Sequence, residues 1–534
     1  MSTDERVKKL KEEGNKLFAQ KQYVAAAEKY TEALQLGGDN AVLYSNRAAC
    51  RLKMKTYLDA ESDATKATEI DPEFSKAYAR LATAQDALRQ PYRSIPSWKK
   101  ALDKLPKEVL TPAQRNQRED EYEKGLTLAE SALNKLRTSG GSHLIHAPSN
   151  QRDLPWFCAQ RMIPDLMEQR NYTSSAWALA NAYTEFAEGI RQLSLATTQG
   201  QLRFQSTSAL TLISNAILTD HRVFHINGPE FLQKYNQQVL GEAQFFKAWT
   251  HEGPDIIKQK VLERLEEEGW HTTSPALTTT MRAWIMQGFY QGGLYQNHVA
   301  EVEFLGRTIE IIKWGRERFK DIRKEYRGVM FEETFLRGVQ MLHLEALLKV
   351  IAKADDATLE ATLQEANEVI AGVNAATIPP RDSNPAFVSA YYYKPKGQAL
   401  SLKAMYYRVR ANRMKAQNGS LSSSVMDKYS SASRYYLEAA DCYAEDDENH
   451  AVFLNAGLEM MWSCKTSIRN QLAVMERIRL AIPKMKKIWG QSSFAKQGGD
   501  IIFKRGQDME RIMREGLNKR KYQLDELVVL DAQR

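Results

Sequence analysis

Apolar and small residues recur with a period of 34 residues through the first hundred positions of the chain. Small residues recur where two helices must approach closely, and Pro or Gly closes each unit. The pattern predicts one helical hairpin repeated three times. Its columns are Leu10, Tyr44 and Tyr78; Gly14, Ala48 and Ala82; Ala26, Ala60 and Ser94; Ala33, Ala67 and Ala101; and Gly38, Pro72 and Pro106.

The first helix of each hairpin is predicted over residues 7–20, 41–54 and 75–88. The third hairpin departs from the pattern because Pro91 and Pro96 flank the start of its second helix. Proline has no N–H to donate, so this helix is predicted to begin late, near Ser94.

Stacked hairpins cannot bury their outer apolar face without a cap. Residues 111–136 form an amphipathic stretch that suits a capping helix, so the first domain is predicted over residues 1–136. Residues 137–155 are rich in Gly, Ser, Pro and Asn, which predicts a linker.

Residues 156–534 are predicted to form a large helical domain. Apolar residues return there at helical spacing, and no alternating strand pattern of useful length is present. The clearest helical stretches cover 176–193, 207–218, 333–352 and 449–463, and residues 377–384 and 417–424 are expected to be loops. The fold class is therefore predicted to be all-α.

The repeat columns resemble the tetratricopeptide repeat (TPR), which implies a three-repeat superhelix closed by the capping helix. Some later segments carry parts of the same signature. They are Trp284, Gly288, Ala300 and Phe304, and then Ala432, Tyr436 and Ala439. The second domain is thus either a TPR-like solenoid or an irregular helical bundle, and the sequence leaves both open.

Five polar residues lie on the predicted first helices of the hairpins: Lys11, Asn15, Asn46, Lys76 and Arg80. In stacked hairpins of this kind these helices line one concave groove. Two cations four residues apart on a helix repel each other, so a bound anion would relieve them. Asn amides beside Lys and Arg suit a carboxylate, and a chain ending in Asp offers two.

The segments LKEEGNKLF, VLYSNRAAC and FSKAYAR resemble the dicarboxylate-clamp TPR domains of Hsp70/Hsp90 co-chaperones, which grip the C-terminal EEVD tail of heat-shock chaperones. All five clamp positions are present. The resemblance implies that Lys11, Asn15 and Asn46 hold the terminal carboxylate and its Asp, while Lys76 and Arg80 contact the acidic side chain and backbone. It also implies that Phe18 and Ala49 line an apolar pocket. Which chaperone class is preferred does not follow.

Composition places the chain in a broad class. It has 534 residues, no run of 18 apolar residues, no apolar leader and four scattered cysteines, so we expect a soluble cytoplasmic protein without a membrane span. Of the net charge of +8, +7 lies in residues 477–534, where 14 Lys or Arg face 7 Asp or Glu. A solvated basic helix is the favoured interpretation. The alternative to a solvated helix is that this segment binds RNA, acidic lipid or an acidic protein surface. Because the solvated helix is favoured, a nucleic-acid partner is not expected.

Signals for catalysis are weak. His221 and His225 have i, i+4 spacing but no third ligand, so no metal or cofactor is expected. Cys442 and Cys464 lie on apolar stripes and are interpreted as core thiols. The tyrosines at 391–393 could stack on a base, but a helical core explains them as well.

The interpretation is a non-enzymatic, co-chaperone-like adaptor. Its clamp would bind an EEVD tail, and its helical domain would hold a client or second partner. Two alternatives remain: a structural scaffold or RNA binder with a vestigial clamp, and an enzyme with an unrecognised helical catalytic domain.

Overall fold

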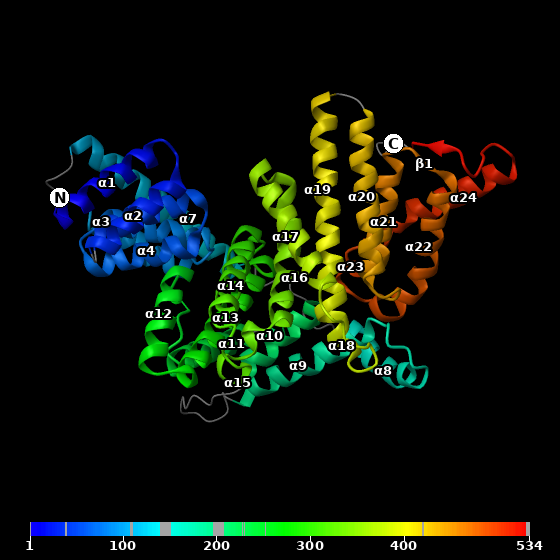
Figure 1. The fold of residues 1–534 in the computed structure, drawn as a ribbon, viewed down its shortest axis with the longest axis horizontal. Coiled ribbons are helices and arrows are strands. Elements are labelled where there is room, and N and C mark those ends of the chain that lie inside the picture. Colours follow the sequence, from blue (N-terminus) through cyan, green and yellow to red (C-terminus); the bar gives the residue numbers. More distant parts are fainter. Residues whose placement is uncertain are drawn as a thin grey trace. The chain divides into compact units, whose positions relative to one another are not determined.

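The computed structural model describes residues 2–37, 40–106, 111–138, 151–195, 208–226, 228, 230–250, 252–418 and 421–529. The fold is all-α, as predicted, and Figure 1 shows the order of its helices. The predicted linker lies largely outside the described residues, and its last residues begin a short 3-10 helix and then α8.

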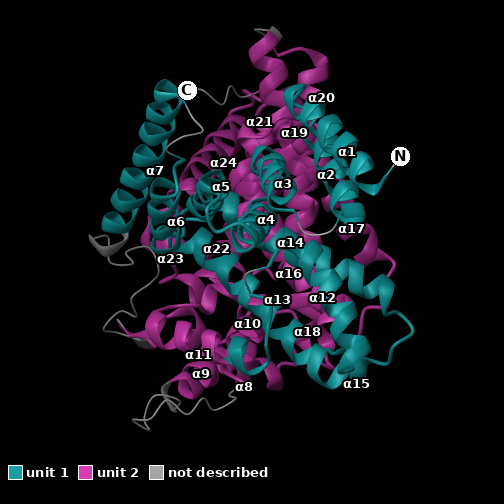
Figure 2. Cartoon of the chain, turned by 90° about the vertical axis from the view of Figure 1, so that its left-hand side faces the viewer, with its two compact units in different colours: residues 1–144, 242–328 teal, residues 145–241, 329–534 magenta. Residues whose placement is uncertain are grey.

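Contacts divide the chain into two compact units (Figure 2). Unit 1 comprises residues 1–144 and 242–328, and unit 2 comprises residues 145–241 and 329–534. These boundaries differ from the predicted ones, because a segment that follows the predicted linker by about a hundred residues packs with the repeats. Within the described residues, no helix is both long and apolar enough to cross a membrane.

The three predicted hairpins are present at the start of unit 1. Their helices are α1 (Thr3–Ala19) and α2 (Tyr23–Gly37), α3 (Ala41–Met54) and α4 (Tyr57–Ile70), and α5 (Ser75–Ala87) and α6 (Pro91–Asp103). α1 begins before the predicted residue 7 because Ser2 and Glu5 form a capping box. A Cβ atom at Gly14 would lie 2.7 Å from the Tyr30 ring, which explains the small residue in this column.

The prediction that the second helix of hairpin three begins near Ser94 is wrong. α6 begins at Pro91, because a proline suits the first helical position, where its missing N–H has no partner to lose. Pro96 then lies inside the helix. Its ring faces solvent, where the carbonyl that it leaves without a helical donor can be hydrated.

The predicted capping helix is confirmed as α7 (Pro112–Thr138), which packs on α5 and α6. Tyr122 of α7 is 4% exposed, and its ring centroid lies 5.9 Å from that of Trp98. Gly125 permits this approach, since a Cβ atom there would lie 2.6 Å from the Trp98 ring. The apolar face left open by the third hairpin is thereby buried.

The later segment of unit 1 contains α12 (Pro254–Glu267), α13 (Trp270–Gly293), α14 (His298–Arg318) and α15 (Lys324–Arg327). α13 and α14 form a hairpin at the place where Trp284, Gly288, Ala300 and Phe304 carry the partial signature. A Cβ atom at Gly288 would lie 3.2 Å from Cβ of Phe304, so the small residue again allows two helices to approach.

Unit 2 is built mainly from helices that pack on their sequence neighbours. α20 and α21 form such a pair, and Ala432, Tyr436 and Ala439 are buried in it. The helices are α8 (Pro155–Glu168), α9 (Ala176–Leu195), α10 (Ala209–Asp220), α11 (Phe231–Phe245, which crosses the unit boundary), α16 (Glu333–Val350), α17 (Asp356–Asn374), α18 (Pro385–Val388), α19 (Lys394–Asn418), α20 (Ser423–Asp441), α21 (Glu448–Trp462), α22 (Ile468–Trp489), α23 (Ser493–Lys496) and α24 (Ile502–Asn518).

Short elements complete unit 2. β1 (Thr466–Ser467) and β2 (Leu527–Val528) pair antiparallel, a contact too short to leave an alternating pattern in the sequence. The predicted loop at 377–384 is confirmed, whereas the one at 417–424 is shorter than predicted, because α19 reaches Asn418 and α20 begins at Ser423. The tyrosines at 391–393 lie in a π-helical turn, Ser389–Tyr393, where Tyr392 is buried.

Candidate functional site

The predicted clamp residues lie on the first helix of each hairpin: Lys11 and Asn15 on α1, Asn46 on α3, and Lys76 and Arg80 on α5. A chain of hydrogen bonds connects three of them. Asn46 Nδ2 donates to Asn15 Oδ1 at 3.3 Å, and Arg80 donates to Asn46 Oδ1 at 3.4 Å. The structure therefore brings residues from all three hairpins together, while Lys11 lies one turn before Asn15 on α1.

Tyr30 of α2 orients the Asn15 side chain through a hydrogen bond. Its hydroxyl donates to Asn15 Oδ1 at 2.7 Å, and its side chain is 1% exposed. Because Asn15 Oδ1 accepts from both Tyr30 and Asn46, the Asn15 amide N–H groups are left to donate to a ligand. This contact was not predicted from the sequence, because Tyr30 lies in none of the repeat columns.

The cations of this cluster, Lys11, Lys76 and Arg80, have no ion pair with a carboxylate in the part of the chain that the structure describes. Burial lowers the pKa of Arg80 to about 10, and no carboxylate acts on its guanidinium to raise it. Lys76 is exposed, but neighbouring protein atoms remove part of its hydration and lower its pKa, and the charge of Arg80 lowers it further. Partly desolvated cations without counter-charges favour an anionic ligand.

Phe18 and Ala49 lie on α1 and α3, respectively. The Phe18 ring meets Tyr23 edge to face at a centroid distance of 5.3 Å, and it packs against the buried cluster around Ala26. Ala49 is half-buried. That Phe18 and Ala49 line a pocket for an apolar residue of the ligand stays a prediction.

The repeats of this chain are similar in sequence to those of known proteins. The search against family models found no match. The small glutamine-rich tetratricopeptide repeat-containing protein 2 of Saccharomyces cerevisiae is 36% identical over 136 residues, 26% of this chain and 38% of its own length. Heat shock protein STI1 of the same yeast is 38% identical over 125 residues, 22% of this chain and 21% of its own length.

The α1–α7 region is a TPR domain similar to those of Hsp70/Hsp90 co-chaperones. This chain spans well under half the length of either relative. Among solved structures, the first TPR domain of Spaghetti bound to an HSP90 peptide aligns with 28% identity over 24% of this chain and 97% of its own, with a TM-score of 0.22.

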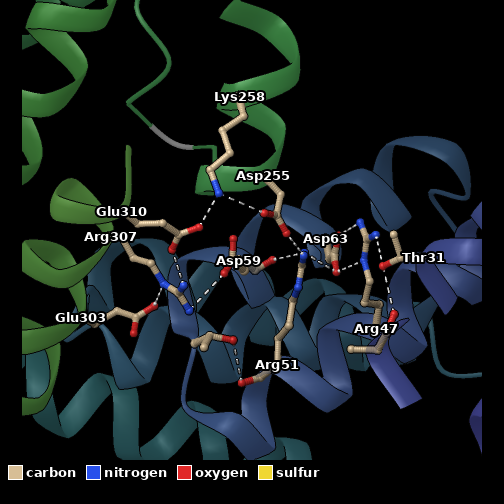
Figure 3. A network of polar contacts seen from close by, with 12 residues as sticks. Thr31, Arg47, Arg51, Asp59, Asp63, Asp255, Lys258, Glu303, Arg307 and Glu310 are labelled. Carbon is tan, nitrogen blue, oxygen red and sulfur yellow. Dashed lines mark hydrogen bonds and ion pairs between the residues drawn. The ribbon is translucent and has the colours of Figure 1, made fainter. Parts of the chain in front are cut away.

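The TPR domain also carries a second polar cluster, which we call the back network, and which the sequence did not predict (Figure 3). Arg47 and Arg51 of α3 both pair with Asp63 of α4 at 2.7 Å. Arg51 also pairs with Asp255 of α12 at 2.6 Å. The network therefore binds the second hairpin to a helix that begins about 200 residues later.

Arg307 of α14 forms the other half of the back network. It pairs with Asp59 of α4 at 3.2 Å, with Glu303 at 3.3 Å and with Glu310 at 2.6 Å. Lys258 of α12 connects the halves, because it pairs with Glu310 at 2.5 Å and with Asp255 at 3.7 Å.

Burial is the main influence on the pKa values of two carboxyl groups at the centre of the back network. It raises the pKa of Asp59 to about 6, although the charges of Arg51 and Arg307 act against the rise. It likewise raises the pKa of Glu303 to about 7. Gly253 lies directly on Asp59, and a Cβ atom there would lie 2.6 Å from Asp59 Oδ1. Close backbone contact thus shields this side of the network from water.

A pocket of about 540 Å³ opens beside the back network, lined by residues that include Thr31, Arg47, Met54 and Asp255. Its cations are already paired with carboxylates of the chain. The back network is therefore neutralised from within, unlike the clamp.

The other candidate residues lie in unit 2. His225 is 5% exposed, stacks on Trp156 at 4.6 Å and hydrogen-bonds the Val223 carbonyl, so it belongs to the core rather than to a metal site with His221. No cluster of metal-ligating side chains occurs within the described ranges. Cys464 is buried and Cys442 half-buried, and burial raises the pKa of the Cys442 thiol to about 11.

Unit 2 also contains a buried ion cluster. Lys394 and Arg222 both pair with Asp220, at 2.6 and 2.7 Å, and Arg222 pairs with Asp447 at 2.8 Å. Arg222 lies over the Trp489 ring at 3.9 Å. Two cations and two carboxylates balance, so this cluster connects α10, α19, α21 and α22 without a free charge.

Several cations of the described part of the basic end, residues 477–529, are paired with carboxylates. Arg479 and Arg514 contact Glu510, Lys486 contacts Asp500, and Lys484 contacts Glu445. These pairs support the interpretation as solvated basic helices.

Proposed function

We propose that this protein is a co-chaperone-like adaptor whose TPR domain binds the C-terminal EEVD tail of heat-shock chaperones through Lys11, Asn15, Asn46, Lys76 and Arg80. The observation that carries the proposal is the contrast within one domain. Cations of the back network are paired with carboxylates, whereas no carboxylate among the described residues pairs with the cations of the clamp.

The proposed ligand supplies the missing charges. A chain ending in Asp presents two carboxylates, and charge-assisted hydrogen bonds to a partly desolvated site contribute about 1.5 to 3 kcal/mol each. Three or four such bonds offset the loss of translational freedom and reach the micromolar range, about −8 kcal/mol. The similarity to yeast co-chaperone relatives supports the same ligand class.

The first test compares a peptide ending in EEVD with its C-terminally amidated form, using the full chain and isothermal titration. We expect amidation to weaken binding about tenfold or more, because it removes one of the two carboxylates. Lys76→Glu should abolish binding without lowering the unfolding temperature, since Lys76 is exposed. Lys124→Glu on α7 makes the same charge change at another exposed position and should bind normally. Equal affinity for acid and amide would contradict the proposal.

We extend the proposal to unit 2, which would hold a client or second partner. Ile501 and Leu527 are 72% and 62% exposed near the end of the chain, and exposed apolar side chains of this size favour protein contacts. Partners that bind Lys76→Glu as well as the wild type, but not Ile501→Ser or Leu527→Ser, would support this assignment. Loss of every partner in Lys76→Glu would contradict it. The four free thiols fit a reducing, cytoplasmic location.

A further inference from the structure

The capping helix α7 brings two more arginines toward the clamp. Arg115, Arg118 and Tyr122 are spaced i, i+3 and i+7, so they share one stripe of the helix. Tyr122 is buried against Trp98, which turns this stripe toward the hairpins. Both arginines are half-buried, although most of α7 is exposed.

The charge of Arg118 acts on one of the clamp cations, Lys76. This positive charge lowers the pKa of Lys76, after desolvation and Arg80. Tyr122 responds to both Arg118 and Arg80, although burial is its main influence and raises its pKa. Glu121 acts in the opposite sense on Lys76 but is exposed and forms no ion pair with Arg118 among the described residues.

The order of the helices gives the direction in which a bound chain would meet these charges. α3 contacts α5, and α5 contacts α7. Packed helices lie about 8 to 10 Å apart, and an extended chain advances about 3.3 Å per residue. A chain whose end is held between α1 and α3 therefore passes α5 after about three residues and approaches α7 after about six.

We propose that Arg118, with Arg115 one turn before it, binds acidic side chains located about three to six residues upstream of the bound C-terminus. These arginines make the groove select an acidic tail over any other tail that ends in Asp. The inference rests on the proposed function, because it assumes that the clamp holds the chain end. In this proposal the clamp residues bind the chain end, and the capping helix α7 selects for acidic residues upstream of it.

The test uses the full chain and two fluorescein-labelled octapeptides, one ending in EEEEVD and one ending in QQQQVD. Both end in the same Asp, so both engage the clamp. The wild type should prefer the acidic peptide. Arg118→Gln should weaken the acidic peptide about fivefold and leave the neutral peptide within about twofold, as measured by anisotropy titration at fixed salt.

Lys124→Gln is the matched control, because it removes one positive charge from an exposed position on another face of the same helix. It should leave both affinities unchanged. Adding Arg115→Gln to Arg118→Gln should reduce the preference further. Circular dichroism checks that each variant retains its helices.

Two outcomes would overturn the inference: Arg118→Gln weakens both peptides equally, or it changes neither. Amidated versions of both peptides separate this failure from failure of the clamp. If amidation abolishes binding but Arg118→Gln has no effect, only the proposed selectivity for acidic tails is rejected. Indifference to amidation rejects the proposed function itself.

Discussion

Neighbouring residues on one helix of the TPR domain have opposite electrostatic surroundings. Asn46 of α3 joins the clamp, and the next residue, Arg47, pairs with Asp63 on the other side of the helix. A turn of about 100° per residue is enough to separate the two networks. The i, i+4 spacing of Lys76 and Arg80 was visible in the sequence, but whether a cation is paired depends on partners that only the fold brings near.

Glu303 gives a prediction at the same scale. Burial raises its pKa to about 7, above the value of about 4.5 expected in the unfolded chain. The folded state therefore binds the proton more tightly, so the contribution of Glu303 to the free energy of unfolding decreases as pH rises from about 4.5 to about 7. Glu303→Gln should match the wild type near pH 4.5 and be more stable at pH 8, by about 3 kcal/mol.

Urea unfolding of the full chain at both pH values measures this effect. Glu317→Gln changes an exposed carboxyl of the same helix, α14, and should show no such dependence on pH. If Glu303→Gln is instead less stable at pH 8, attraction to Arg307 outweighs burial.

Among the helices, α6 shows what local sequence rules decide and what they leave open. The 34-residue period predicted the hairpins and the capping helix because small residues mark close approaches along the chain itself. It did not decide which proline would start α6. Both Pro91 and Pro96 are compatible with a helix start, and burial of Pro91 and Ser94, which precede Pro96, favours the longer helix.

Pro96 should therefore weaken α6. Pro96→Ala restores an N–H that can donate to the Tyr92 carbonyl, and we expect it to raise the free energy of unfolding by about 1 kcal/mol. Pro91→Ala is the control, since proline suits the first helical position and its loss should give no gain. Urea midpoints of the two variants make the comparison. A lower midpoint for Pro96→Ala would mean that the ring contributes packing that alanine lacks.

In the molecule as a whole, the membership of α12–α14 in unit 1 could not be predicted. Their contacts with the TPR domain depend on single charged residues, such as Asp255 and Arg307, whose spacing along the chain has no period. The partial repeat signature at Trp284 predicted a hairpin there, but a hairpin signature does not indicate its neighbours. The helices that carry the five clamp residues were predictable because these residues lie on the first helix of each repeated hairpin.

Arg307→Ala should loosen this association. It leaves Asp59 and Glu303 buried without their shared cation, which we expect to destabilise unit 1 by about 3 kcal/mol. Amide exchange in α4 should rise in the variant. Arg318→Ala, an exposed change on α14, should have no effect, and adding Glu303→Gln to Arg307→Ala should recover part of the loss. Unchanged exchange in α4 would show that apolar packing alone holds these helices together.

The back network joins residues that are synthesised at different times. Arg51 is translated 204 residues before its partner Asp255. At ribosomal rates of about 5 to 20 residues per second, the nascent hairpins spend about 10 to 40 s with Arg51 unmatched by that partner. During that interval Asp63 is the carboxylate available to both Arg47 and Arg51 from within the same hairpin, so it would hold this face in shape until α12 emerges.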